Sequence, residues 1–173
     1  MKTIFVSGGT GSFGKTFLKK ILNEKKDLKK IIVFSRDEFK QYSLKSELLS
    51  HKNFNKIRFL IGDIRDRERL NTTLENVDTV IHAAALKQVD TAEYNPSEFI
   101  KTNILGTQNI VDASIYHNIK KVIFLSTDKA TSPINLYGAT KLCAEKIILT
   151  ANNIKGKRGI VFSVVRYGNV TSS

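Results

Sequence analysis

The chain has little of what membrane and secreted proteins require. It has one cysteine in 173 residues, Cys143, so it cannot form an internal disulfide, which is typical of a protein in a reducing compartment. No apolar run approaches the ~18 residues that span a bilayer. The first apolar stretch, residues 4–6, leads directly to glycines and does not resemble a signal peptide. These absences predict a soluble, cytoplasmic protein with no membrane partner.

Acidic residues are also scarce. There are 16 Asp and Glu against 28 Lys and Arg, which leaves a net charge of +12. Such a charge is typical of nucleic-acid-binding proteins and of sites for anionic ligands. Seven of the lysines lie between Lys15 and Lys30, but no nucleic-acid-binding motif accompanies them. We therefore favour a solvated basic face, with no nucleic-acid partner, that helps to attract a phosphate-bearing ligand.

Short strand-forming segments alternate with longer segments of helical periodicity. Most predicted strands are nearly continuous in Ile, Val, Leu and Phe, which is typical of a parallel sheet covered on both faces. This order predicts an α/β fold, a Rossmann-type doubly wound parallel sheet flanked by helices, with ligands beyond the carboxyl ends of the strands. The predicted strands are residues 3–7, 30–35, 57–61, 79–82, 121–126 and 159–166, and the predicted helices are 14–23, 38–49, 66–74, 96–117 and 137–152.

A glycine-rich turn follows the first predicted strand. Gly8, Gly11 and Gly14 have the spacing Gly-x-x-Gly-x-x-Gly between a strand and an amphipathic helix, which is typical of a dinucleotide site. We expect Gly8 to permit the tight turn, Gly11 to admit a pyrophosphate, and Gly14 to let the helix pack closely, while the helix N-terminus attracts the anion. No Lys-Ser/Thr pair ends the turn, which favours a dinucleotide over ATP or GTP. The predicted contacts are Gly8, Thr10, Gly11, Ser12, Phe13 and Gly14.

Further cofactor contacts are predicted after the next three strands. Arg36 ends the second strand, where an acidic residue is usual for NAD and an arginine can bind a 2′-phosphate. Asp37 follows it, so NAD stays an alternative, but we favour NADP. A Gly-Asp-Ile segment after the third strand is placed to reach the adenine, or else forms a polar turn. Three alanines after the fourth strand predict a small-residue floor. The predicted contacts are Ser35, Arg36, Asp63, Ile64, Ala83, Ala84 and Ala85.

Two Tyr-x-x-x-Lys pairs are candidates for acid–base chemistry. Tyr116 precedes a strand and is expected at the amino end of the sheet, whereas Tyr137 opens a helix that follows a strand end, with Lys141 on the same helix face. A free tyrosine has a pKa of about 10, so acting as a base near pH 7 requires about 3–4 kcal/mol of phenolate stabilisation. One ammonium at ~4 Å supplies about that much at an effective dielectric of ~20. Thr127, or Ser126, is placed to hydrogen-bond a hydroxyl being oxidised, which predicts a hydride-transfer site.

Six segments in this order resemble the extended short-chain dehydrogenase/reductase superfamily. More closely they resemble its inverting UDP-N-acetylglucosamine 4,6-dehydratases, lyases that make sugar nucleotides for flagellin or surface-polysaccharide modification. The resemblance extends from residue 3 to about Val170, and its most specific parts are Ser-Thr-Asp-Lys and Leu-Tyr-Gly-Ala-Thr-Lys. The segments are Ser7–Gly14, Phe34–Glu38, Ile61–Asp66, His82–Val89, Leu125–Ala130 and Asn135–Lys141.

The resemblance implies a catalytic set made of Thr127, Asp128, Lys129, Tyr137 and Lys141. Tyr137 is implied to remove the C4-hydroxyl proton of a UDP-sugar while hydride passes to NADP, with Tyr137 and Lys141 also contacting the cofactor. Lys129 is implied to abstract the C5 proton and Asp128 to protonate the departing C6 hydroxyl. Return of the hydride to C6, with C5 reprotonated from the other face, then gives the inverted 4-keto-6-deoxy sugar. Outside this context, Asp128 and Lys129 would be interpreted as a solvated turn pair.

The resemblance also predicts substrate contacts and an organisation. The implied substrate contacts are Lys87, Asn103, Tyr167 and Asn169. We expect residues 1–173 to form an NAD(P)-binding Rossmann domain, with the family's C-terminal substrate-binding portion absent and the full-length protein a homo-oligomer. Two alternatives stay open: another sugar-nucleotide epimerase or reductase of the superfamily, which would not need the Asp128–Lys129 pair, and an inactive cofactor-binding fragment.

Other chemistries find no support in the sequence. His51, His82 and His117 are dispersed without carboxylate or cysteine partners at metal-binding spacing, so no metal site is predicted. His82 ends an apolar strand, which favours a packed histidine over a ligand. Neither a Gly-x-Ser-x-Gly motif nor a Cys–His arrangement indicates a hydrolase.

Overall fold

The protein, described by a computed structural model over residues 2–168, is built on one parallel sheet. Its six strands lie in the order β3-β2-β1-β4-β5-β6. This order is that of the Rossmann fold. Strands β1 to β3 are added toward one edge of the sheet and β4 to β6 toward the other, so the topological switch point lies between β1 and β4. The predicted fold class is therefore confirmed. The strands are β1 Lys2–Ser7, β2 Leu28–Ser35, β3 Ile57–Ile61, β4 Thr79–His82, β5 Lys121–Thr127 and β6 Val161–Tyr167.

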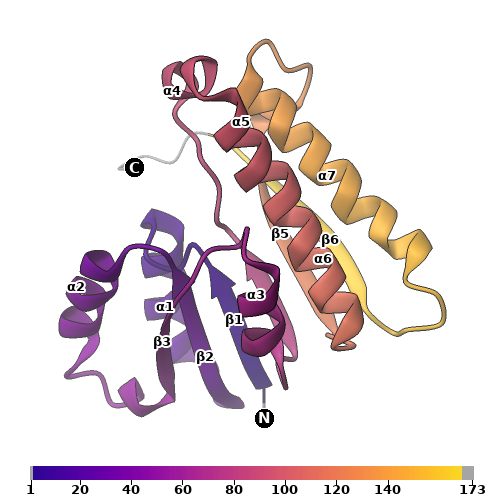
Figure 1. Ribbon diagram of the computed structural model, residues 1–173. Coiled ribbons are helices and arrows are strands. Elements are labelled where there is room, and N and C mark those ends of the chain that lie inside the picture. The colour runs from indigo at the N-terminus through magenta and orange to yellow at the C-terminus, as the bar shows by residue number, and fades with distance from the viewer. Residues whose placement is uncertain (1, 169–173) are drawn as a thin grey trace.

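Helices cover both faces of the sheet (Figure 1). Helices α1 and α2 pack on one face, and α3, α6 and α7 pack on the other. The longer helices are α1 Ser12–Glu24, α2 Glu38–Leu48, α3 Arg67–Leu74, α6 Gly106–Tyr116 and α7 Leu136–Ile154, and the short ones are α4 Val89–Tyr94 and α5 Pro96–Phe99. A π-helical segment, η2 Ile100–Leu105, and two 3-10 turns, η1 Phe54–Lys56 and η3 Asp128–Ala130, complete the elements.

The pleat of β2 explains why its apolar run is continuous. Ile31 and Val33 contribute to the core beneath α1 and α2, while Ile32 and Phe34 contribute to the core beneath α3, α6 and α7. Successive side chains of a strand point to opposite faces, so a strand covered on both sides must be apolar throughout. Burial on both faces therefore drives the folding of this segment.

The sequence predicted one continuous helix over residues 96–117, and this prediction is wrong. The segment consists of α5, the π-helical η2 and α6. A π-turn adds a residue to the turn, which breaks the 3.6-residue periodicity. Ile100, the first residue of η2, is 41% exposed, whereas Phe99 in α5 and Ile110 in α6 are buried. The sequence analysis also missed α4, whose six residues are too few for a periodic pattern.

Side-chain caps begin several of the helices. Asp37 accepts a hydrogen bond from Lys40 N, Asp66 from Arg69 N and Asn135 from Gly138 N. Helix α1 begins without a side-chain cap, so its first N–H groups have no such partner. No helix within residues 2–168 is both long and apolar enough to cross a membrane. Across the same residues, His, Cys, Asp and Glu side chains form no group that could hold a metal ion.

Candidate functional site

The glycine turn brings β1 against the end of β4. Gly8 has a φ of +66°, and a Cβ at this position would lie 2.8 Å from the Ala84 backbone, so the predicted tight turn at Gly8 is confirmed. A Cβ at Gly14 would lie 2.4 Å from Gly9 O, so the helix packs closely at Gly14, although against the turn and not against a strand. Gly11, Ser12 and Phe13 are exposed, and Thr10 is buried. The turn therefore presents the uncapped start of α1 to solvent.

Two cations and one carboxylate meet beyond the ends of β2 and β3. Arg36 Nη1 lies 3.5 Å from Asp63 Oδ2, and Arg65 donates to Asp63 through Nε and Nη2. Burial opposes the ionisation of Asp63, but hydrogen bonds from Arg65 and the charges of Arg65 and Arg36 hold its pKa below the ordinary value. The Arg36 side chain is half-exposed. The structure thus brings the predicted Arg36 and Asp63 together.

Ile64 and Ser35 face inward at the same edge. The Ile64 side chain is buried in the core, where a Cβ on Gly106 would lie 2.7 Å from it. The predicted contact of Ile64 with a cofactor would therefore be made through its backbone. Ser35 accepts a hydrogen bond from Gln41 Nε2, which also donates to Leu60 O and so joins β2 to β3.

The segment after β4 runs alongside Gly8. Ala83 N donates to Ser7 O and Ala84 N to Ser7 Oγ, both at 3.2 Å. Asn103, on η2, accepts from Leu86 N at 2.8 Å and donates to Leu86 O at 3.0 Å. Asn103 is 2% exposed, so it supports this segment from beneath, whereas Lys87 is exposed. The predicted substrate contact by Asn103 is replaced by a role inside the protein.

Three of the predicted catalytic residues meet at the carboxyl end of β5. Thr127 Oγ1 donates to Asp128 Oδ1 at 2.9 Å, and the Thr127 and Tyr137 hydroxyls share a hydrogen bond. Tyr167, at the end of β6, is close enough to influence Tyr137. The remaining predicted substrate residue, Asn169, lies outside the described residues.

Lys129 and Asp128 line an open cavity of about 310 Å³. Lys129 Nζ lies 3.4 Å from Asp128 Oδ1, and both side chains are substantially exposed. The hydrogen bond from Thr127, with the charge of Lys129, holds the pKa of Asp128 below its ordinary value. The cavity walls also include Ile134 and Asn135, from the loop that leads into α7. A carboxylate and an ammonium group therefore face this cavity together.

The predicted lowering of the Tyr137 pKa by Lys141 is wrong. Burial raises the pKa of Tyr137, the hydrogen bond with Thr127 lowers it, and the net direction is upward. The Lys141 ammonium donates to Leu125 O at 2.7 Å and lies 4.0 Å from the centre of the Phe124 ring. The Lys141 side chain therefore points toward β5. Its direction is set by the Leu125 carbonyl and the Phe124 ring on that strand, and not only by its position four residues after Tyr137 on the helix.

Glu145 is a neighbour of Lys141 that the sequence analysis missed. It is 3% exposed, accepts from Arg166 Nε at 2.8 Å, and its charge raises the pKa of Lys141 against the larger effect of burial. Arg166 also donates to Thr131 Oγ1, which links β6 to the loop after η3. The spacing of Tyr137, Lys141 and Glu145 along one helix face was the available signal.

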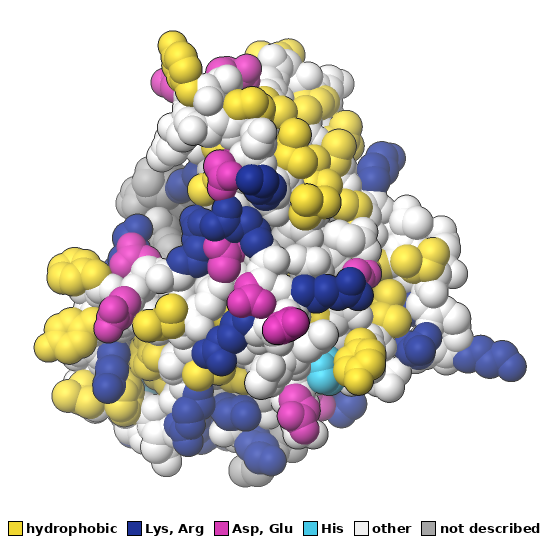
Figure 2. Space-filling model, viewed as in Figure 1, with side chains coloured by type: hydrophobic (Ala, Val, Ile, Leu, Met, Phe, Trp, Pro, Cys, Tyr) yellow, Lys and Arg dark blue, Asp and Glu magenta, His cyan; other side chains and the backbone are white. Residues whose placement is uncertain are grey.

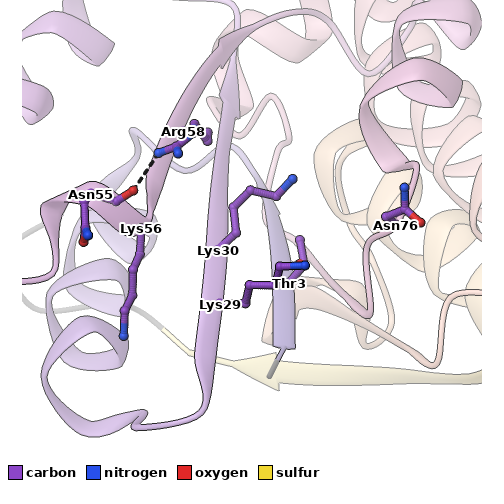
Figure 3. Close-up of a pocket in the computed structure, with 7 residues that line it drawn as sticks. All are labelled: Thr3, Lys29, Lys30, Asn55, Lys56, Arg58 and Asn76. Atoms are coloured by element: carbon purple, nitrogen blue, oxygen red, sulfur yellow. Dashed lines mark hydrogen bonds between the residues drawn. The ribbon is translucent and has the colours of Figure 1, made fainter.

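The opposite edge of the sheet has a separate basic depression. A cavity of about 390 Å³ lies at the amino ends of β1, β2 and β3, among Lys30, Lys56 and Arg58 (Figure 3). The side chains of Lys30 and Lys56 point in different directions and do not converge on one point. Tyr116 is also at an amino end, at the start of the connection to β5, and is 74% exposed. Ligands of this fold bind at the carboxyl ends, so this depression is not the candidate site.

The surface in Figure 2 mixes both signs of charge. Acidic side chains lie between the basic ones on this face, and hydrophobic side chains gather over α5, η2 and α7. Exposed apolar residues in these elements include Ile100, Leu105 and Leu149. A further group of hydrophobic side chains lies at the left of the view, over α2, where Phe39 and Tyr42 are exposed. The face is therefore a solvated charged surface with more than one apolar region.

Known proteins match this chain along nearly its whole length. A family model described as polysaccharide biosynthesis protein matches residues 4–173. The UDP-N-acetylglucosamine 4,6-dehydratase (inverting) of Campylobacter jejuni subsp. jejuni serotype O:23/36 (strain 81-176) is 55% identical over 172 residues, 99% of this chain and 50% of that protein. The X-ray structure of Pen from Bacillus thuringiensis has a TM-score of 0.92 and 47% identity, over 98% of this chain and 50% of that one.

A third match carries a bound cofactor. The UDP-glucose 4-epimerase from Brucella ovis in complex with NAD has a TM-score of 0.77 and 26% identity, over 98% of this chain and 52% of that one. The chain thus spans about half the length of the proteins it matches.

Proposed function

The chain belongs to the polysaccharide biosynthesis protein family, and on that premise we propose that residues 1–173 are the cofactor-binding domain of an NADP-dependent, C5-inverting UDP-N-acetylglucosamine 4,6-dehydratase. The observation that carries the proposal is the cluster of Thr127, Asp128 and Tyr137 beside Lys129. An epimerase or reductase needs a tyrosine base, but only the dehydration needs a second acid–base pair. The 55% identity with the Campylobacter jejuni dehydratase supports the same choice.

The glycine turn fits a dinucleotide pyrophosphate. A Cβ at Gly11 would meet only Gly8 O, at 3.3 Å, so the glycine leaves space above the turn. Helix α1 begins there with free N–H groups and no acidic residue in its first turn. These groups offer hydrogen bonds and a partial positive charge to an anion. Arg36, half-exposed beside Asp63, is suited to a 2′-phosphate and supports NADP over NAD.

The chain's own residues account for the proton movements of a dehydration. Bound NADP would accept the C4 hydride and return it to C6 after water has left, with C5 reprotonated from the other face. Tyr137 takes the proton of the C4 hydroxyl, held to that hydroxyl with the help of Thr127. The positive charge of a bound nicotinamide would lower the Tyr137 pKa, which burial raises in the chain alone. Lys129 removes the C5 proton, which a C4 ketone acidifies, and Asp128 delivers a proton to the leaving C6 hydroxyl. The pKa of Asp128 lies below its ordinary value in the chain alone, so Asp128 must first take up a proton. Burial under a bound substrate would favour that protonation by raising the pKa.

The positions of Lys87 and Tyr167 also favour this assignment of roles. Lys87 is exposed next to the supported Leu86 segment and is free to reach an anionic sugar nucleotide. Tyr167 lies close enough to Tyr137 to influence its pKa. Asn103 serves as a positioning residue for the segment that carries Lys87. We further propose that the complete protein is a cytoplasmic homo-oligomer.

An epimerase of the same superfamily is the second candidate. The NAD-bound epimerase from Brucella ovis supports it, because its fold matches this chain closely. The two functions differ in what Lys129 must do, since epimerisation leaves the C5 and C6 bonds intact. A third candidate is a domain that binds the cofactor without catalysis.

One incubation separates the three candidates. The protein is mixed with UDP-N-acetylglucosamine and NADP, and the products are identified by mass spectrometry and NMR. A 4-keto-6-deoxy sugar nucleotide supports the dehydratase, and a C4 epimer would contradict it. In Lys129→Ala, product should be lost with cofactor binding retained, whereas Lys157→Ala, at an exposed loop position, should behave as wild type. Cofactor binding without turnover would support the third candidate.

A further inference from the structure

His82 is a buried histidine that has no part in the chemistry proposed above. It is 0% exposed, at the end of β4, with Nδ1 2.7 Å from Ser7 Oγ and Nε2 3.0 Å from Thr107 Oγ1. Burial, and secondarily the charge of Lys141, lowers the pKa of His82 to about 3, so the ring is neutral at physiological pH. A neutral imidazole has one donor nitrogen and one acceptor nitrogen. The neighbours of the ring decide which nitrogen is which.

The hydrogen bonds of Thr107 determine which His82 nitrogen carries the proton. Thr107 Oγ1 lies 2.6 Å from the backbone carbonyl of Asn103, which can only accept, so the single Thr107 hydroxyl proton is donated there. Thr107 Oγ1 can then only accept from His82, which places the ring proton on Nε2. Nδ1 is left as an acceptor, and Ser7 must donate its hydroxyl proton to it. The Ser7 oxygen in turn accepts from Ala84 N at 3.2 Å.

The two ends of this chain of hydrogen bonds hold the same segment. Ser7 Oγ binds the amide of Ala84, and the side chain of Asn103 binds both backbone groups of Leu86. These two residues flank Ala85. The hydroxyl protons of Ser7 and Thr107 are each donated to one acceptor, His82 Nδ1 and Asn103 O. The hydrogen bonds of this network therefore have one consistent direction and resist rearrangement.

We propose that His82, as its Nε2–H tautomer, is a positioning residue that fixes the backbone of Ala84–Leu86 against the cofactor site. The cofactor part rests on the proposed function; the positioning of the backbone does not. The same network reaches the helix that carries the tyrosine, since Asn103 Nδ2 donates to Thr140 Oγ1 and Thr140 Oγ1 donates to Tyr137 O. His82 thereby connects the floor after β4 with the first turn of α7.

The tautomer can be observed directly. Long-range ¹⁵N–¹H correlation spectra of the full chain assign the protonated nitrogen of each of its three histidines. We expect the His82 proton on Nε2, with no protonation of this ring down to pH 5. A proton on Nδ1 would reverse the two hydrogen bonds of the His82 ring, leave the Asn103 carbonyl without the Thr107 proton, and overturn the proposal.

The positioning role is tested by a matched pair of threonine variants. Thr107→Val removes the hydroxyl that orients His82, while Thr102→Val removes a buried hydroxyl that has no hydrogen-bond partner within the described residues. Both threonines are at most 4% exposed and lie in or next to η2. In Thr107→Val we expect the amides of Ala84 and Leu86 to exchange with solvent about fivefold faster and the NADP Kd to rise about fivefold. Thr102→Val should leave both unchanged.

A conservative series distinguishes positioning from general stability. Gln places an amide nitrogen near the position of Nε2, so His82→Gln should retain more protection at Ala84 and Leu86 than His82→Leu at matched stability. Equal exchange at these amides in Thr107→Val and Thr102→Val would overturn the proposal. If wild type binds no NADP, the proposed function fails, and the exchange rates at Ala84 and Leu86 still decide whether His82 positions this backbone.

Discussion

Lys141 donates a 2.7 Å hydrogen bond from its buried ammonium to the backbone carbonyl of Leu125, on the strand beneath its helix. The same ammonium lies over the Phe124 ring, whose other neighbour is the His82 imidazole at 5.2 Å between ring centres. Two basic side chains thus approach one aromatic ring. Burial lowers the pKa of both, and a neutral His82 avoids placing a second positive charge near Lys141.

Because Lys141 is buried, the stability of the fold should increase with pH above about 7. Burial lowers the pKa of Lys141 to about 7 from an ordinary 10.5. Below pH 7 Lys141 is protonated in both the folded and the unfolded chain, so the full cost of burying its charge opposes folding. Between pH 7 and pH 10.5 the unfolded chain binds more protons than the folded chain, so the free energy of unfolding rises with pH. The stability gained on Lys141→Met should therefore fall by up to about 1.4 kcal/mol per pH unit in that window, measured by urea unfolding.

Lys155→Met is the control for that measurement, because Lys155 also donates to a backbone carbonyl, that of Ile160, from a less buried position. The stability difference between Lys141→Met and wild type should change with pH more steeply than the difference between Lys155→Met and wild type. A pH-independent difference between Lys141→Met and wild type would contradict the buried-charge interpretation.

The Glu145–Arg166 pair should matter more than a surface pair. Glu145 is 3% exposed and accepts two hydrogen bonds from Arg166, so Glu145→Gln leaves the arginine without its charged partner and removes the charge that favours protonated Lys141. We expect a larger loss of unfolding free energy than for Glu47→Gln, whose pair with Lys19 is about half exposed and belongs to a class contributing about 0–1 kcal/mol. Urea unfolding of both variants at pH 7 measures the difference; equal losses would contradict the prediction.

Arg36 should select the phosphorylated cofactor. A bidentate arginine–phosphate contact contributes about 1.5–3 kcal/mol, so Arg36→Ala should weaken NADP binding by about 10- to 100-fold with little change for NAD. Titration calorimetry with both cofactors gives the ratio. Arg58→Ala, at the opposite edge of the sheet, is the control and should change neither affinity. Equal weakening of NAD and NADP in Arg36→Ala would argue against a 2′-phosphate contact.

Gly14 should tolerate no side chain. The methyl group of Gly14→Ala would lie 2.4 Å from a backbone oxygen, which cannot move aside like a flexible side chain. We expect a loss of about 1–3 kcal/mol in unfolding free energy. At Gly159 a Cβ would meet nothing within 4 Å, so Gly159→Ala serves as the control and should cost far less. Similar unfolding midpoints for the two variants would show that the turn relaxes to accept a methyl group.

The fold was largely predictable because its signals are local. Strands β3 and β4 have the predicted bounds, and the parallel Rossmann arrangement follows from continuous apolar strands separated by helices. The failures lie where periodicity is short or interrupted, at α4 and at the π-helical η2. Neither a six-residue polar helix nor one added residue in a turn leaves a pattern that 3.6-residue spacing can detect.

The candidate site divides in the same way. The sequence alone places the glycine turn, Arg36, Thr127–Lys129 and Tyr137 at the carboxyl ends of strands, since motif and strand end are adjacent in the chain. Only the tertiary structure decides that Lys141 faces Leu125, that Asn103 supports Leu86, and that His82 joins Ser7 to Thr107. The direction of a buried polar side chain depends on partners that come from other strands and helices, 75 residues away in the case of Ser7 and His82. Such partners become neighbours only when the sheet has formed.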